Sequence, residues 1–203
     1  MLPKNSTDRR IIRTKVAIRD ALVYLIEKKG FDEILVSDLA ERANINRGTF
    51  YLHYQDKYDL LDKTQKEIVD NIEGIIQQTN TLKSADILNF EKPLPVLKSI
   101  FEYLKQNSDL MHAIFNLEGG VRFQAQIRKA VEKNFQLEQY AGLKERNFLV
   151  PPQFIISYAV SAHFGVIQEW LDRGCLESPS EMAIILSKIS WFGVVRSMGF
   201  SQK

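Results

Sequence analysis

The stretch from Val36 to Leu61 constrains the fold more than any other, because it has the pattern of two short helices, a tight turn between them and a third helix behind. Apolar residues recur at helical spacing up to Ala43. The run then stops at Asn44, a residue type that tolerates the left-handed backbone of a sharp turn. Asn46 is a natural N-cap for the second helix. This order of elements predicts a helix-turn-helix.

The second helix of this motif is expected over Arg47–Tyr54, and its two faces differ in chemistry. Phe50 and Tyr54 share the face that would pack inward. The opposite face presents hydrogen-bonding groups from Arg47, Thr49, Tyr51 and His53. A short helix with such an outward face suits the major groove of DNA. Asp56 is the expected N-cap of the third helix, which continues an apolar stripe for about six turns.

Residues on both sides of the motif extend it into a longer pattern. The matching positions are Thr14, Lys15, Ala17, Ile18, Ala21, Leu25, Gly30, Phe31, Asp38 to Ala40, Ala43, Asn46 to Tyr51, His53, Tyr54, Lys57, Leu60 and Leu61. This pattern resembles the DNA-binding domain of the TetR family of transcriptional regulators, over about the first third of the chain and across three helices. The chain departs from the family at Leu35, where a capping Thr is common, and we expect Ser37 to supply either that cap or a phosphate contact.

The resemblance implies an all-α protein of two domains with about nine helices in total. Residues 1–57 would form a three-helix DNA-binding head with helices over 9–29, 37–43 and 47–54, and residues 58–203 a helical domain for effector binding and dimerisation. The third helix of the motif would be the lever between the two domains. The implied function is a DNA-binding transcriptional regulator, by default a repressor, that binds a palindromic operator as a dimer and is released by a small-molecule effector.

Nine residues are candidates for DNA contacts. Arg47 suits a bidentate contact to guanine, Thr49 a hydroxyl or methyl contact, and Tyr51 a base edge or a phosphate. Gly48 has no side chain and lets the backbone approach DNA closely. The resemblance implies contacts to the sugar-phosphate backbone from His53 and Lys57, and Thr14, Lys15 and Ser37 are further candidates for phosphate contacts. The alternative is that Tyr51 and His53 only pack between helices.

Charge is distributed unevenly along the chain, although the net charge is only +2. Residues 1–57 hold eleven Lys or Arg against eight Asp or Glu, and the remainder holds sixteen against seventeen. The excess is concentrated in the first twenty residues, as a segment lying beside phosphates would require. A solvated basic tail is the alternative interpretation.

Helical patterns continue to the end of the chain, and no alternating run indicates a strand. The expected helices cover residues 94–106, 108–115, 121–140, 153–173 and 180–199. The last two helices are apolar on more than one side, so each must pack against other protein surfaces on most of its sides. A second copy of the same pair would supply it in a symmetric four-helix homodimer interface, which we expect around Phe164, Trp170, Ile185 and Ile189. The alternative is that both helices are core of a monomer.

The effector pocket is the least defined site. In the family it lies among the middle helices of the second domain, where the plausible lining residues are Phe101, Leu104, Met111, Phe115, Phe123, Phe154 and Tyr158, with His112 or His163 as a polar anchor. Aromatic and Met side chains at helical spacing are more often core than pocket, and a lone His is usually a satisfied core residue. The sequence therefore assigns no ligand contact.

Several classes of function are excluded by what the sequence lacks. The three His residues form no i,i+4 pair, and neither a Gly-rich phosphate loop nor a nucleophilic Ser elbow is present, so no enzyme, metal site or cofactor is expected. Cys175 is alone, which fits a reducing cytoplasm. The charged N-terminus does not have the pattern of a signal peptide, and charges interrupt the two most apolar segments, so no membrane span is expected.

Two further interpretations stay open. In one, the protein binds DNA as an activator or co-regulator that is controlled by a protein partner instead of a small ligand. In the other, it is a helical interaction protein whose head contacts other proteins. A roomy, partly polar cavity would favour a small ligand, and DNA binding that weakens steeply with added salt would exclude the interaction protein.

Overall fold

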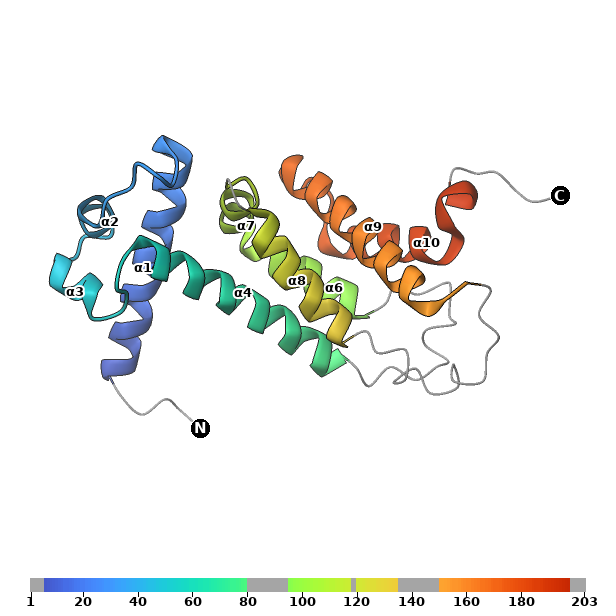
Figure 1. Cartoon of the computed structure of the whole chain (residues 1–203), viewed down its shortest axis with the longest axis horizontal. Helices are drawn as coiled ribbons and strands as arrows, with labels where there is room; N and C mark the ends of the chain where they lie inside the picture. Colours follow the sequence, from blue (N-terminus) through green and yellow to red (C-terminus); the bar gives the residue numbers. More distant parts are fainter. Residues whose placement is uncertain (1–5, 80–94, 118–119, 135–149, 198–203) are drawn as a thin grey trace. The chain divides into compact units, whose positions relative to one another are not determined.

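The computed structural model describes residues 6–79, 95–117, 120–134 and 150–197. All regular structure in these ranges is helical, and nine helices lie within them (Figure 1). The expected all-α class is confirmed. The loops expected at 79–93 and 142–152, and the expected end of a helix near Tyr140, lie wholly or largely outside the described residues.

Two compact units make up the chain. One consists of Met1–Ile68 and His112–Val121, and the other of Val69–Met111 and Arg122–Lys203. The first division falls inside the long helix α4, Lys57–Thr79, so this helix contributes residues to both units.

Three helices precede α4 in the first unit: α1 (Ser6–Lys29), α2 (Val36–Arg42) and α3 (Arg47–Tyr51). Helix α1 begins three residues earlier than expected, and α2 begins and ends one residue earlier. Helix α3 ends at Tyr51 and not at Tyr54, and the N–H of His53 donates to the carbonyl oxygen of Phe50, three residues back, at 2.9 Å, as in a tight turn. We call α1 to α3, with the first turns of α4, the head.

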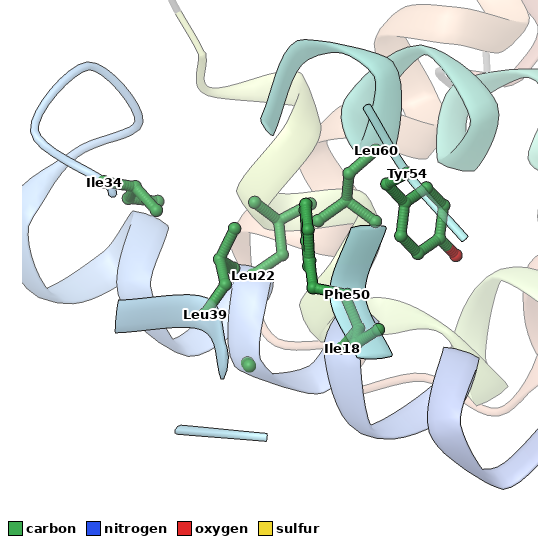
Figure 2. Close-up of a cluster of buried hydrophobic side chains, with 8 residues drawn as sticks. Ile18, Leu22, Ile34, Leu39, Phe50, Tyr54 and Leu60 are labelled. Carbon is green, nitrogen blue, oxygen red and sulfur yellow. The ribbon is translucent and has the colours of Figure 1, made fainter. Parts of the chain in front are cut away.

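The helices of the head close around one apolar core (Figure 2). Ile18 and Leu22 come from α1, Leu39 from α2, Phe50 from α3 and Leu60 from α4, and all five are fully buried. Burying one such side chain contributes about 1.5–3 kcal/mol. A helix as short as α3 is not stable by itself, so its place in the head depends on this packing.

The turns of the head depend on residues that accept a left-handed backbone. Asn44 has a φ of 53°, which confirms its expected role in the turn between α2 and α3. Gly30 has a φ of 76°, and its N–H donates to the carbonyl oxygen of Ile26 at 2.9 Å, so it ends α1 as expected. Asn46 occupies the N-cap position of α3, but its side chain makes no capping hydrogen bond, so that part of the expectation is wrong.

Two carboxylates fix the starts of α2 and α4. Leu35 is the N-cap residue of α2, and its N–H donates to Asp38 Oδ2 at 2.8 Å. Ser37 lies inside α2 and does not cap it. At α4, the N–H of Asp59 donates to Asp56 Oδ1 at 2.8 Å, which confirms the expected cap.

The second unit is built from helices that begin within one residue of their expected positions. They are α6 (Pro95–Gln106), α7 (Ser108–Phe115, shared with the first unit), α8 (Gly120–Asn134), α9 (Pro152–Asp172) and α10 (Pro179–Ser197). Helix α10 packs against α6 and α9. Gly193, with a φ of 66°, interrupts the helical backbone of α10.

Trp170 is the central side chain of this packing. It is 1% exposed, and its ring stands edge-on to Phe101 of α6 with the ring centroids 5.1 Å apart. Its indole N–H donates to the carbonyl oxygen of Glu177 at 3.2 Å. Because Trp170 is buried within its own chain, it offers almost no surface to a partner, and the dimer interface expected around it stays a prediction.

Candidate nucleic-acid interface

Helix α3 has one buried side and one exposed side. Phe50 is fully buried, and Tyr54, in the turn that follows, is 8% exposed. The other side carries the exposed Arg47, Gly48 and Tyr51 and the half-buried Thr49. The predicted inward packing of Phe50 and Tyr54 is therefore confirmed.

On the exposed side of α3 the backbone is accessible at Gly48, and the ring of Tyr51 is oriented by contact with the core. A Cβ atom built at Gly48 would meet no heavy atom within 4 Å, so the helix backbone is accessible there. The ring of Tyr51 stands edge-on to Phe50, with centroids 5.6 Å apart, while 57% of the Tyr51 surface stays accessible. A side chain oriented by the core and exposed at its other end is suited to contact a ligand surface.

Asp38 ties the start of α2 to the end of α1. Its carboxylate accepts hydrogen bonds from Lys29 Nζ at 2.5 Å and from the N–H of Leu35 at 2.8 Å. These bonds, the Lys29 bond first, hold the pKa of Asp38 below its ordinary value, and the nearby charge of Arg47 acts in the same direction. Asp38 is therefore ionised at neutral pH, and Arg47 of α3 lies within its field.

His53 and Lys15 are brought close together. His53 follows α3 and is half-buried, and this burial lowers its pKa, with the charge of Lys15 on α1 adding to the effect. The imidazole is therefore neutral at pH 7. Two residues predicted to contact the DNA backbone thus lie near each other, although 38 positions separate them in the sequence.

Thr14 and Ser37 are the remaining candidates for backbone contacts, and both side chains are half-buried. Thr14 Oγ1 donates to the carbonyl oxygen of Arg10, one helical turn earlier, at 2.9 Å. With this bond in place the Thr14 hydroxyl keeps only its oxygen lone pairs, which accept hydrogen bonds. To donate to a phosphate, the Thr14 hydroxyl would therefore have to give up its hydrogen bond to the carbonyl oxygen of Arg10.

Lys57 is half-buried and is bonded to the turn between α1 and α2. Its ammonium donates to the carbonyl oxygens of Phe31 and Asp32, at 3.0 and 2.6 Å, in the turn between α1 and α2. The same nitrogen lies 5.1 Å from the ring centroid of Phe31 and 5.3 Å from that of Tyr58. Of the residues predicted to contact DNA, Lys57 is the one whose charged group has several partners within the protein.

Sequence reasoning missed two other contacts of the head. Lys63 Nζ donates to Asp59 Oδ2 at 2.8 Å and to the carbonyl oxygen of His53 at 3.2 Å, so α4 holds the end of the turn after α3. The guanidinium of Arg42 lies 4.2 Å from the ring centroid of Tyr24. The spacing of Asp59 and Lys63, four residues apart on a helix, could have indicated the first contact, whereas no local pattern indicates the second.

Two family models match this chain and together cover well over half of it. The model described as bacterial regulatory proteins, tetR family, matches residues 18–64, which span the head from α1 to α4. The model described as transcriptional regulator C-terminal region matches residues 91–190. The chain belongs to the TetR family. Members of this family are DNA-binding transcriptional regulators and not enzymes, as the sequence predicts.

The match to one curated relative extends over most of the chain. The uncharacterized HTH-type transcriptional regulator YxbF of Bacillus subtilis (strain 168) is 31% identical over 184 residues, which are 87% of this chain and 44% of YxbF. The chain spans about half the length of the curated relatives it matches.

Solved structures of transcriptional regulators share the fold. The Bacillus subtilis regulator FadR, solved in complex with stearoyl-CoA, is 17% identical with a TM-score of 0.62, and the match covers 88% of this chain and 98% of FadR. The dihydroxyacetone kinase operon activator DhaS is 19% identical with a TM-score of 0.57, covering 93% and 98% of the two chains. At these identities the likeness shows the fold alone.

The residues predicted to line a TetR-type effector pocket are not all alike in burial. Phe101, Leu104, Met111 and Phe123 are buried and Phe115 is half-buried, whereas Phe154 and Tyr158 are 64% and 63% exposed. Of the two candidate anchors, His112 is exposed and bonds to Asn116, and His163 Nε2 lies 2.9 Å from Ser190 Oγ, with its pKa lowered by burial. No helix among the described residues is both long enough and apolar enough to cross a membrane.

Proposed function

We propose that this TetR-family protein is a cytoplasmic, dimeric repressor that binds a palindromic operator through its two heads and is released by a small-molecule effector. The observation that supports DNA binding most directly is the two-sided α3. Phe50 fixes the helix in the core of the head, and Arg47, Gly48 and Tyr51 are left exposed beside it. Such a helix can enter a major groove without unpacking the head.

The proposed contacts divide into readout and positioning. Arg47 would pair with guanine, and Thr49 and Tyr51 would touch base edges, with Gly48 allowing close approach. Thr14, Lys15, Ser37 and His53 would contact the sugar-phosphate backbone, and the motif position of Lys57 implies the same for it. In this proposal residues 1–57 are the DNA-binding domain, and residues 58–203 bind the effector and dimerise.

The test of DNA binding starts with selection of bound sequences from a random pool, followed by affinity measurements on the selected site and on scrambled DNA. The affinity is expected to fall steeply as salt rises. Arg47→Ala should relax base preference at one position of each half-site and cost about 1–3 kcal/mol. Arg42→Ala is the matched control, because Arg42 is exposed in the same unit but stacks on Tyr24. Absence of salt-dependent binding at low salt would reject the proposal and leave a helical interaction protein.

A homodimer through α9 and α10 is supported by apolar side chains that the chain leaves uncovered. Phe154 and Tyr158 of α9 are more than half exposed, and Ile184 and Ile185 of α10 are each 39% exposed. Phe164 and Ile189, which are half-buried on the same two helices, would belong to the edge of such an interface. Exposed apolar surface on two neighbouring helices is typical of a symmetric interface.

Release by an effector would act through the spacing of the two heads. An effector that binds one arrangement of the dimer better than the other shifts the population toward it, and α4, which belongs to both units, would carry the change. The stearoyl-CoA complex of FadR is a precedent within the fold. Screening metabolites for loss of operator binding tests this step, and an effector must weaken DNA binding without unfolding the protein.

The second candidate is an activator or co-regulator that answers to a protein partner. It is favoured by the shared fold with DhaS, which is described as an operon activator. A reporter gene placed behind the selected operator separates the two: repression lowers expression when the protein is present, and activation raises it.

A further inference from the structure

Arg128 on α8 is a half-buried cation with an unusual partner. Of the Lys and Arg side chains whose burial the structure describes, three are half-buried. Arg19 pairs with the carboxylate of Glu67 at 3.9 Å, and the ammonium of Lys57 donates to two carbonyl oxygens. The Nη1 atom of Arg128 donates instead to the hydroxyl oxygen of Ser161 on α9, at 2.7 Å. Arg128 therefore meets a neutral hydroxyl where the other two meet a carboxylate or carbonyls.

No carboxylate pairs with Arg128 in the described part of the chain. Glu132 lies one turn further along α8, at the spacing of a helical ion pair, and is itself half-buried. The two side chains nevertheless form no ion pair. The positive charge of Arg128 is thus left without a negative partner from the described residues.

Ser161 orients the guanidinium of Arg128. Its Oγ donates to the carbonyl oxygen of Ser157, one turn earlier on α9, at 2.7 Å. Because the hydroxyl proton is engaged in that bond, the Oγ lone pairs are left to accept the N–H of Arg128. A guanidinium has five N–H donors in a fixed plane, so one bond to Ser161 sets its orientation and leaves donors for a further acceptor.

The face of α9 that carries Ser161 is open. Ser157, Ser161 and Gly165 follow one another at intervals of four residues, so they share this face, and all three are exposed. A Cβ atom built at Gly165 would meet no heavy atom within 4 Å. A small molecule can therefore approach the face beside Arg128 without displacing a side chain at position 165.

The kind of acceptor that fits Arg128 follows from its charge and shape. Partial burial of a guanidinium costs hydration free energy, which a negatively charged or strongly polar partner normally offsets. A single hydroxyl offsets little of this cost. Carboxylate and phosphate groups match the planar fork of a guanidinium, because two parallel N–H groups can donate to two of their oxygens.

We infer that Arg128, oriented by Ser161, forms an anion site in the second unit, and that the effector binds it through a carboxylate or phosphate group. The identity of this anion as the effector rests on the proposed function, whereas the anion site itself does not. Sequence reasoning considered His112 and His163 as polar anchors, but these side chains bond to Asn116 and Ser190. Arg128 belongs to no sequence motif, so only the fold reveals its place beside Ser161.

Binding of small anions tests the site directly. The probes are phenyl phosphate, benzoate and the neutral benzamide, titrated into the full chain by calorimetry at constant ionic strength. The two anions should bind and benzamide should not, and the tighter of the two assigns the site to phosphate or carboxylate. Arg128→Gln should weaken anion binding by about ten-fold or more, because it removes a charge-assisted hydrogen bond. Lys129→Gln, at the exposed neighbour on α8, is the matched control and should bind as the parent does.

Stability in the absence of a ligand separates a binding role from a structural one. If Arg128 is held ready for an anion, Arg128→Gln should be at least as stable as the parent, because it removes a half-buried charge that lacks a negative partner. Phenyl phosphate should then raise the melting temperature of the parent and not that of the variant. In ¹⁵N NMR spectra of the parent, the Nε–H signal of Arg128 should shift as phenyl phosphate is added. A variant that is less stable without ligand would make Arg128 a structural brace and overturn the inference.

The remaining outcomes keep the anion site apart from the proposed function. If phenyl phosphate binds at Arg128 but the protein does not bind DNA, the proposed function fails and the anion site stands. If neither anion binds the parent, or if both bind Arg128→Gln as tightly, the anion site fails whatever happens on DNA. If Arg128→Gln dissociates a dimer and no anion binds, the partner of Arg128 is a second copy of the chain, which also overturns the inference.

Discussion

The head closes its apolar core within one chain, whereas the second unit leaves apolar side chains of α9 and α10 exposed. In the head, the five side chains that meet in the core are fully buried, and the exposed side of α3 is mainly polar. In the second unit, Trp170 is equally buried, yet Phe154, Tyr158 and Ile185 remain accessible. The head also exposes apolar side chains, among them Leu35 and Leu52 at 63% and 80%, so the contrast is one of position: in the second unit such side chains gather on α9 and α10, where a second chain could cover them together.

The largest effect is expected from removing the side chain that fixes α3. Phe50→Ala should lower the free energy of unfolding by about 3–5 kcal/mol, because it empties a fully buried aromatic site. Urea denaturation followed by circular dichroism measures this loss. Tyr51→Ala, one residue along and 57% exposed, should cost far less. Equal losses would mean that the two sides of α3 do not differ as described.

The second prediction concerns Ile185, an exposed apolar residue of α10 in the proposed dimer interface. Ile185→Asp should raise the dissociation constant of the dimer by about two orders of magnitude or more, because a charge buried without a partner in each copy costs several kcal/mol. Sedimentation equilibrium provides the measurement. Leu176→Asp, in the connection between α9 and α10 and 71% exposed, is the matched control. A dimer unaffected by Ile185→Asp would place the interface elsewhere.

Trp170 in the second unit is buried within its own chain, as Phe50 is in the head. Trp170→Phe keeps most of the packing against Phe101 but removes the bond to the carbonyl oxygen of Glu177. Stability should fall by about 1–3 kcal/mol, since a polar group is left unsatisfied. The dissociation constant of the dimer should not change at concentrations where the protein is folded. A weakened dimer with unchanged stability would return Trp170 to the interface.

The smallest effect concerns the surface of the head at low pH. The pKa of Asp38 is lowered by its bonds to Lys29 and the N–H of Leu35, so its ionised form stabilises the folded state. That contribution is present above the ordinary value of 3.8 and is lost as pH falls through the lower folded value. Asp38→Asn should therefore be less stable than the parent at neutral pH, and the difference should shrink below about pH 4. Thermal unfolding of the parent and of Asp38→Asn is measured between about pH 2 and 7. A difference in stability between the two proteins that stays constant with pH would contradict this account.

What the sequence predicts well is local. Asn44, Phe50 and Asp56 each act within a few residues of their own position, through a turn, a helix face or a cap, and the structure agrees with all three. Asn46 shows the limit of such reasoning, because N-cap preference is statistical and its side chain makes no cap bond.

Interactions between distant residues could not be predicted from the sequence. The acceptors of Lys57 are main-chain carbonyls, which every residue has, so nothing in the residue types at positions 31 and 32 indicates them. The partner of Trp170 lies 69 residues away on another helix, and an apolar stripe does not tell which apolar residues meet each other and which meet a second chain. The family pattern names the expected DNA contacts, but only the fold distinguishes an exposed Lys15 from a half-buried Lys57 whose ammonium is bonded to main-chain carbonyls.

Gly48 has a further consequence for altering the protein. Its surroundings are empty, and its φ is not in the left-handed region, so a side chain added at this position would strain nothing inside the head. Replacing a helical Gly by Ala usually gains up to about 1 kcal/mol in stability. An alanine at position 48 would therefore make the head more stable while occupying the space through which the helix backbone is proposed to approach DNA, so this substitution separates folding from DNA binding.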